Sequence, residues 1–152
     1  MQEIAIRLFV LAIAFSASGL LALPAPAAAQ TIEPAKVTRP AGTKPFAADP
    51  ATLLAIGHKR HDDTSLSRNG RSCNTCHTPE DSYNPTFNKP YAHFVQSVKA
   101  KTGLEEITAE GMVQFCMISA LDAQPLAWDS EALAALTAFV IDRNKRAVAK
   151  AR

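Results

Sequence analysis

Five consecutive residues limit what this chain of 152 residues can fold into, because they point to a covalently attached group. Residues 73–77 read Cys-Asn-Thr-Cys-His, a C-x-x-C-H pentad, which is the attachment signature of c-type haem. Two thiols three positions apart can add to the two vinyl groups on one edge of a porphyrin, and the next imidazole then reaches the iron. Cys73, Cys76 and His77 are therefore predicted to hold one covalent haem c, with His77 as the proximal iron ligand.

Three other interpretations of the pentad compete with this one. Cys73 and Cys76 could form a disulfide or a thioredoxin-like redox pair, but such pairs follow a βαβ pattern that the sequence does not show. They could bind zinc, which usually takes four protein ligands, whereas the pentad offers three and adjacent Cys76 and His77 seldom bind one zinc together. The third alternative is a chance occurrence, against which an export signal argues because haem is attached outside the cytoplasm.

The first 29 residues are expected to be a cleaved signal peptide. Arg7 gives a weakly positive start, residues 8–23 are almost wholly apolar, and Ala27-Ala28-Ala29 precedes a cleavage site before Gln30. An uncleaved membrane anchor is the alternative, but the apolar run of about 16 residues is shorter than the roughly 20 that a spanning helix needs. We therefore expect an exported protein, soluble in a bacterial periplasm, without stable membrane insertion after cleavage.

The rest of the chain is predicted to form one all-α domain over residues 49–152, preceded by an extended arm or linker over residues 30–48. Hydrophobic residues make up 47% of the chain and charged residues 20%, a balance too apolar for intrinsic disorder. The formal net charge of +2 is too small to indicate a nucleic-acid partner, and no basic stripe is interleaved with aromatic residues.

Capping residues and apolar periodicity predict helices joined by long loops. Asp49-Pro50, Thr108, and Asp129 or Ser130 are expected to begin helices. Residues 62–91 are predicted to be mostly loop, and they contain the C-x-x-C-H pentad. The expected helices are about 50–60, 91–101 with His93 near its start, 109–121 with Val113, Cys116, Met117 and Ala120 on one face, and about 131–146 with Leu133, Leu136, Phe139 and Val140 as its buried stripe.

A six-coordinate haem needs a second axial ligand, and three sulfur residues on the predicted helix 109–121 are candidates. Met112 lies beside Gly111, which indicates a fraying first turn. Cys116 and Met117 could instead be ordinary core residues. Neighbours on a helix point about 100° apart, so Cys116 and Met117 cannot both bind one iron. Histidines are weaker candidates, since His58 and His61 fit a solvated helix end and His93 a packed or capping role.

Two stretches around the pentad resemble c-type cytochromes. Residues 57–77, GHKRHDDTSLSRNGRSCNTCH, look like the approach to the haem in monohaem cytochromes c and dihaem peroxidase-like cytochromes, and residues 125–140 are similar to their carboxyl-terminal helix. The resemblance covers about residues 50–142, and only the pentad is highly specific. It implies a small cytochrome c-like helical domain around one covalently attached haem, in which the last helix packs across the first.

A second resemblance concerns the distal ligand. Phe115-Cys116-Met117, with Gln124-Pro125-Leu126 and Asp129-Ser130, resembles a region of thiosulfate dehydrogenases and of the haem subunit of thiosulfate-oxidising complexes. In those proteins a cysteine in such a segment is the distal ligand, which implies Cys116 here, with Met117 second. A methionine found five residues later in some relatives is Leu121 in this chain.

The leading hypothesis is a periplasmic monohaem c-type cytochrome that carries single electrons between redox partner proteins. The alternative is a haem component of an inorganic-sulfur, thiosulfate-type oxidising enzyme that uses Cys116-ligated iron, and a third is a haem-based ligand sensor. No nucleophile–base pair or carboxylate dyad is visible, which favours an electron-transfer protein over a stand-alone enzyme. Four basic residues near the pentad could steer an acidic partner or simply be solvated: Lys59, Arg60, Arg68 and Arg71.

Overall fold

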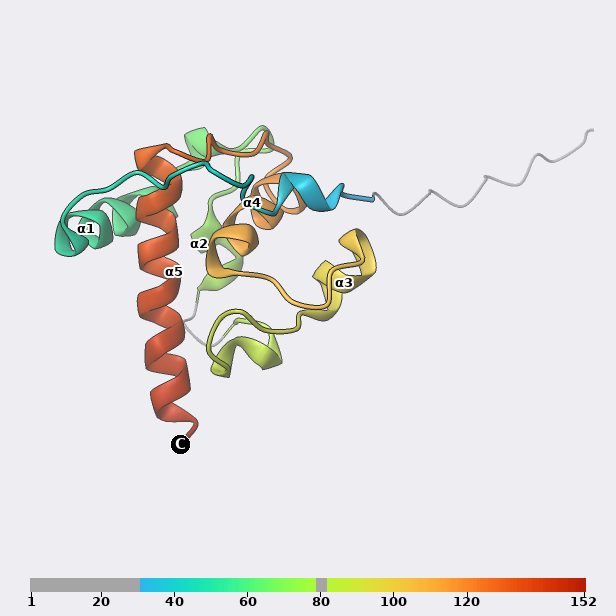
Figure 1. Cartoon of the computed structure of the whole chain (residues 1–152). Helices are drawn as coiled ribbons and strands as arrows, with labels where there is room; N and C mark the ends of the chain where they lie inside the picture. The colour runs from blue at the N-terminus through green and yellow to red at the C-terminus, as the bar shows by residue number, and fades with distance from the viewer. Residues whose placement is uncertain (1–30, 79–81) are drawn as a thin grey trace, which may run out of the picture.

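The computed structural model describes residues 31–78 and 82–152, so the expected signal peptide lies outside the described residues. The described chain is mostly helical and forms no sheet, which confirms the all-α fold (Figure 1). None of its helices is long and apolar enough to cross a membrane. In chain order the helices are η1 (Pro34–Lys36), α1 (Pro50–His61), η2 (Thr64–Leu66), α2 (Cys73–His77), η3 (Pro85–Asn88), α3 (Gln96–Thr102), α4 (Ala109–Ser119) and α5 (Glu131–Lys150), where η denotes a 3-10 helix.

The first and last long helices, α1 and α5, pack across each other, as expected (Figure 1). Helix α1 begins at Pro50, and the carboxylate of Asp49 accepts a hydrogen bond from the Thr52 amide at 2.9 Å. The crossing depends on Gly57, because a Cβ atom there would lie 2.2 Å from the carbonyl oxygen of Ala135 in α5. This close approach brings the end of α1 towards the centre of the molecule.

Helix α5 forms the long edge of the core. The Ser130 hydroxyl accepts from the Leu133 amide at 3.3 Å, which confirms one of the two expected caps. Leu133, Leu136 and Phe139 are each at most 2% exposed, which confirms three residues of the predicted buried stripe, whereas Val140 is only partly buried. The helix continues to Lys150 rather than ending near residue 146, because the following Ala and Lys residues favour a helix and nothing breaks it.

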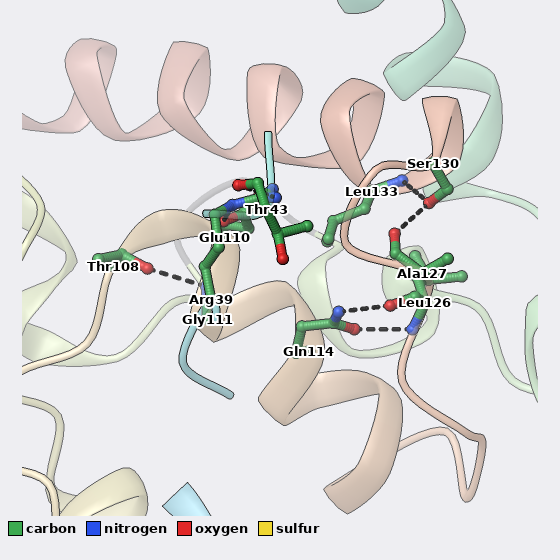
Figure 2. A network of polar contacts seen from close by, with 10 residues as sticks. All are labelled: Arg39, Thr43, Thr108, Glu110, Gly111, Gln114, Leu126, Ala127, Ser130 and Leu133. Atoms are coloured by element: carbon green, nitrogen blue, oxygen red, sulfur yellow. Dashed lines mark hydrogen bonds and ion pairs between the residues drawn. The ribbon is translucent and has the colours of Figure 1, made fainter. Parts of the chain in front are cut away.

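Helix α4 begins as predicted, since the Thr108 hydroxyl accepts from the Gly111 amide at 3.0 Å. It ends at Ser119, two residues early, where the Leu121 amide donates back to the Cys116 carbonyl. The return loop is fixed by Gln114, whose side chain donates to the Leu126 carbonyl at 2.7 Å and accepts from the Leu126 amide at 2.8 Å (Figure 2).

The helix expected over residues 91–101 begins five residues later, as α3 at Gln96. Ahead of it, His93 and Ile107 exchange two backbone hydrogen bonds of 3.3 and 3.1 Å in an isolated antiparallel bridge. Val95 is also extended and buried. Pairing with a distant segment therefore overrides the local helical pattern, and His93 lies in the bridge rather than in a helix.

The segment expected to be an arm or linker packs onto the domain over residues 31–39. Ile32 and Val37 belong to a core cluster, and the Ile32 amide donates to the Lys101 carbonyl at 2.8 Å. Val37 also approaches α4 so closely that a Cβ atom on Gly111 would lie 2.4 Å from its carbonyl oxygen. The first turn of α4 is thus capped and packed rather than frayed, and residues 31–39 are called the strap below.

Candidate cofactor site

One cavity gathers the three residues predicted for haem attachment and the three sulfur residues considered as distal ligands; of the weaker histidine candidates, His61 and His93 line it and His58 does not. It encloses about 1070 Å³ of space not filled by atoms, including its open mouth. Its wall is predominantly apolar and comes from α2, the 83–97 segment, α4 and α5. The predicted residues that line it are Cys73, Cys76, His77, Met112, Cys116 and Met117.

Helix α2 is one short turn that carries the thiols of both Cys73 and Cys76. Its start is fixed by the Ser72 amide, which donates to the Thr75 hydroxyl at 3.0 Å. Cys73 and Cys76 are three positions apart and so lie on one face of the helix, with Cys73 half-buried and Cys76 exposed. Both are free thiols, as is Cys116. The pair is therefore available for covalent attachment along one side of the cavity.

The His77 imidazole is held by the two residues that follow the undescribed segment 79–81. The Nδ1 atom of His77 lies 3.3 Å from the Ser82 carbonyl oxygen, to which it can donate, and the Tyr83 ring stacks on the imidazole at 4.4 Å. The Ser82 hydroxyl donates to the Cys76 carbonyl at 2.9 Å, which ties this clamp to α2. With the proton on Nδ1, Nε2 is the atom left to bind a metal.

Burial lowers the pKa of His77, although the Ser82 carbonyl raises it in part. The imidazole is therefore neutral at neutral pH, which is the protonation state that coordinates a metal ion. The orientation and the charge state of the His77 imidazole are thus compatible with binding a metal ion through Nε2.

A row of rings continues from His77 along the cavity wall. Tyr83 stacks on Phe87 at 4.0 Å, Phe87 meets Tyr91 edge-on at 6.4 Å, and Tyr91 stacks on His93 at 4.3 Å. All four rings line the cavity. The packed role predicted for His93 agrees with its burial and with the 3.3 Å contact of its Nδ1 atom with the Pro90 carbonyl oxygen.

Sequence reasoning missed two members of this row, Tyr83 and Phe87, and the residue that supports it. Tyr83, Phe87 and Tyr91 recur every four residues, which is a usable signal, but they stand in a proline-punctuated segment that is predicted to be loop. Asn144 of α5 is buried, and its side chain donates to the carbonyls of Phe87 and Lys89 at 2.6 and 2.9 Å. These bonds hold η3 and its rings against α5.

The sulfur residues of α4 lie in two environments. The Cys116 Sγ and Met112 Sδ atoms are 4.0 Å apart, one helical turn from each other, and both residues are only partly buried as whole residues. Met117 is 2% exposed and belongs to the core cluster with Leu133 and Leu136. Burial, with smaller contributions from Cys73 and Cys76, raises the pKa of the Cys116 thiol to about 12. Without a nearby cation this thiol therefore stays protonated.

His61 differs from the solvated residue that the sequence predicts. It is 7% exposed, lies 4.6 Å from the Phe139 ring and 6.4 Å from the His77 ring, and lines the cavity. The crossing at Gly57 causes this burial, because it presses the last turn of α1 against α5. Desolvation, aided by His77, lowers the pKa of His61 to about 4. His58 is exposed, with its ring edge-on to Phe139 at 5.0 Å.

The basic residues near the pentad do not line the cavity. Arg60 pairs with Asp63 at 3.0 Å, while Lys59, Arg68 and Arg71 are exposed. In the part of the chain that the structure describes, no three His, Cys, Asp or Glu side chains are grouped so that they could hold a metal ion by themselves.

In comparisons with known proteins, no family model, no curated protein and no solved structure matches the chain.

Proposed function

We propose that this chain is a monohaem c-type cytochrome, a one-electron carrier between redox partner proteins in the periplasm. The observation that carries the proposal is the shared cavity, which has the pentad on α2 at one wall and the sulfur residues of α4 at another. Cys73 and Cys76 would hold the haem through its vinyl groups, and His77 would be the proximal ligand. Haem, when bound, supplies an iron centre that gains and loses one electron.

The residues around the cavity fit this role. The Ser82–Tyr83 clamp fixes the His77 ring, and such outer contacts set the orientation and basicity of a ligand. The apolar wall lowers the local dielectric constant, which is one of the ways in which a protein sets the potential of a haem. Three lining residues, Cys76, Asn84 and Ser97, are exposed. One side of the cavity thus opens to solvent, where an electron can pass to a docked partner without a substrate at the iron.

Cys116 is the distal ligand that we propose, with Met117 second. The Cys116 thiol is half-buried and borders the cavity, and the thiols of Cys73 and Cys76 are near enough to influence its pKa. Met117 makes core contacts with α5 that ligation would disturb. Binding to iron would also give the third cysteine a partner once the other two hold haem.

A redox titration of the purified haem protein tests the carrier function. We expect one reversible one-electron step and no consumption of thiosulfate. Matched variants Cys116→Ala, Met112→Leu and Met117→Leu identify the distal ligand, because only the change at the ligand alters the low-spin spectrum. A protein that carries no haem in a host with the attachment machinery would overturn the proposal.

The position of Cys116 also favours the second candidate, a haem component of a thiosulfate-type oxidising enzyme. A thiolate on iron carries negative charge, stabilises ferric iron and places sulfur beside the metal. This candidate predicts a rhombic low-spin electron paramagnetic resonance signal with a narrow g-spread, together with thiosulfate turnover that Cys116→Ala abolishes. A carrier with a thiolate ligand gives the same signal without turnover, so turnover separates the two functions.

A further inference from the structure

Tyr91 separates the cavity from a second hollow on the other side of the 91–93 segment. This second hollow, the outer groove, lies between the strap, the 104–110 segment and α5, and its lining includes Arg39, Glu106 and Ile141. Among the described residues, Tyr91 alone lines both the cavity and the outer groove. The two hollows therefore meet at this one side chain.

At α5 the two hollows lie on different faces of one helix. On α5, Leu136 and Val140 line the cavity, while their neighbours Thr137 and Ile141 line the outer groove. Successive residues of a helix point about 100° apart, so the body of α5 stands between the two sets. Shortening a side chain on either face of α5 leaves that body in place.

The same arrangement holds at the bridge. His93 lines the cavity and its bridge partner Ile107 lines the outer groove, so the paired backbones lie between them. Tyr91, by contrast, lines both hollows, and no second element stands between them there. Removing its ring is therefore the side-chain change that we expect to join the hollows.

The Tyr91 ring is held in position from both sides. It stacks on His93 at 4.3 Å with an angle of 27° between the planes, and Phe87 meets it edge-on at 6.4 Å. Burial raises the pKa of the Tyr91 hydroxyl, with a further contribution from the Cys116 thiol. The phenol is therefore uncharged.

We propose that the Tyr91 ring closes a second entrance to the cavity and keeps small exogenous ligands in the outer groove from reaching the iron on the Cys116 side. The inference rests on the proposed function, because the iron of the bound haem is what the ring protects. It assigns Tyr91 a role in selectivity, since a carrier that excludes added ligands keeps its axial pair.

Rapid mixing of the ferric haem protein with imidazole tests this role. We expect Tyr91→Ala to bind imidazole about tenfold faster than the wild type, because the outer groove then opens into the cavity. Tyr91→Phe keeps the ring and should keep the wild-type rate. Ile141→Ala is the matched control, since it enlarges the outer groove but leaves the body of α5 in place, and it should also keep the wild-type rate.

Two results would overturn the inference: an unchanged rate in Tyr91→Ala, or an equal acceleration in Ile141→Ala. If Tyr91→Ala does not fold, Tyr91→Leu removes the ring while keeping apolar contacts, and it should still accelerate binding. Covalent haem is measured in each protein before mixing. Its absence from the wild type would refute the proposed function itself, whereas normal haem content with unchanged rates refutes only the role of Tyr91.

Discussion

At the residue scale, His61 shows how packing changes the chemistry of a side chain. The imidazole is buried against Phe139, and its pKa falls to about 4 from an ordinary value of 6.5. Between these two pH values the unfolded chain binds more protons at this position than the folded chain does. Stability therefore rises with pH through this window and is lost as the pH falls from 6.5 towards 4.

His61→Phe should remove this pH dependence while keeping an aromatic contact with Phe139. By pH 5 the wild type should lose about 2 kcal/mol more of its unfolding free energy, relative to pH 7.5, than the variant loses. Urea denaturation at both pH values measures the difference. His77 and His93 are common to both proteins, so equal losses in the two would show that His61 is not buried in its neutral form.

Gln114 illustrates a second kind of residue, a buried amide that satisfies backbone groups. It is 0% exposed and makes both hydrogen bonds of the Leu126 backbone (Figure 2). Gln114→Leu leaves those groups unpaired and should cost about 2–4 kcal/mol of unfolding free energy. Gln124→Leu, at an exposed position, is the control and should change stability by less than about 0.5 kcal/mol. Equal effects of the two changes in urea denaturation would contradict this role.

The pentad and the sulfur residues of α4 are predictable from the sequence because their chemistry lies in local patterns. The clamp on His77, the buried His61 and the Gln114 contact with Leu126 are not predictable. Each depends on segments that meet only in the folded chain, and Gln114 lies 12 positions from its partner. The sequence alone does not distinguish a solvated polar side chain on a helix from one that hydrogen-bonds to the backbone of a distant loop.

At the element scale, helix starts are predicted better than helix ends. Asp49, Thr108 and Ser130 each accept the expected hydrogen bond from an amide of the first turn. These are local interactions between neighbours in sequence. The predicted start of α3 is wrong because His93 pairs with Ile107, and no local sequence pattern indicates this contact. The ends of α4 and α5 are set by a return loop and by continued helix-forming residues.

The crossing of α1 and α5 gives a sharp test at this scale. Gly57→Ala places a Cβ atom 2.2 Å from the Ala135 carbonyl oxygen and 2.9 Å from the Phe139 Cβ atom. The helices must then separate, which should cost about 1–3 kcal/mol despite the better helix propensity of alanine. Ala55→Ser on the exposed face of α1 is the control, expected within about 0.5 kcal/mol of the wild type. Thermal unfolding that leaves Gly57→Ala as stable as the control would contradict the close crossing.

At the scale of the whole molecule, the strap packs against α4 on one side of the cavity. Arg39 donates through Nε to Glu110 at 2.9 Å (Figure 2). Its guanidinium group also lies over the Trp128 ring, 5.3 Å from the ring centroid. Glu110 belongs to the first turn of α4, the helix that carries Cys116. The sequence does not predict this packing, because the three prolines among the small residues of 30–48 are equally typical of a free linker.

Shortening Ile32 tests whether the strap is part of the fold. The side chain is 2% exposed in a cluster with Val95, Val98 and Phe115, so Ile32→Ala should lower the unfolding free energy by about 2–4 kcal/mol. The exposed neighbour Glu33 provides the control, since Glu33→Ala should have little effect. If chemical denaturation shows the same stability for both variants, the strap contributes nothing to the core.

The proposed attachment of one covalent haem to the pentad can be tested by peptide mass spectrometry. Trypsin does not cut between Lys89 and Pro90, so residues 72–99 form one peptide, and Cys116 lies in another, residues 102–143. For protein made in a host with haem-attachment machinery, we predict one haem on peptide 72–99 and none on peptide 102–143. A peptide 72–99 without haem, or with its two cysteines joined as a disulfide, would contradict the account.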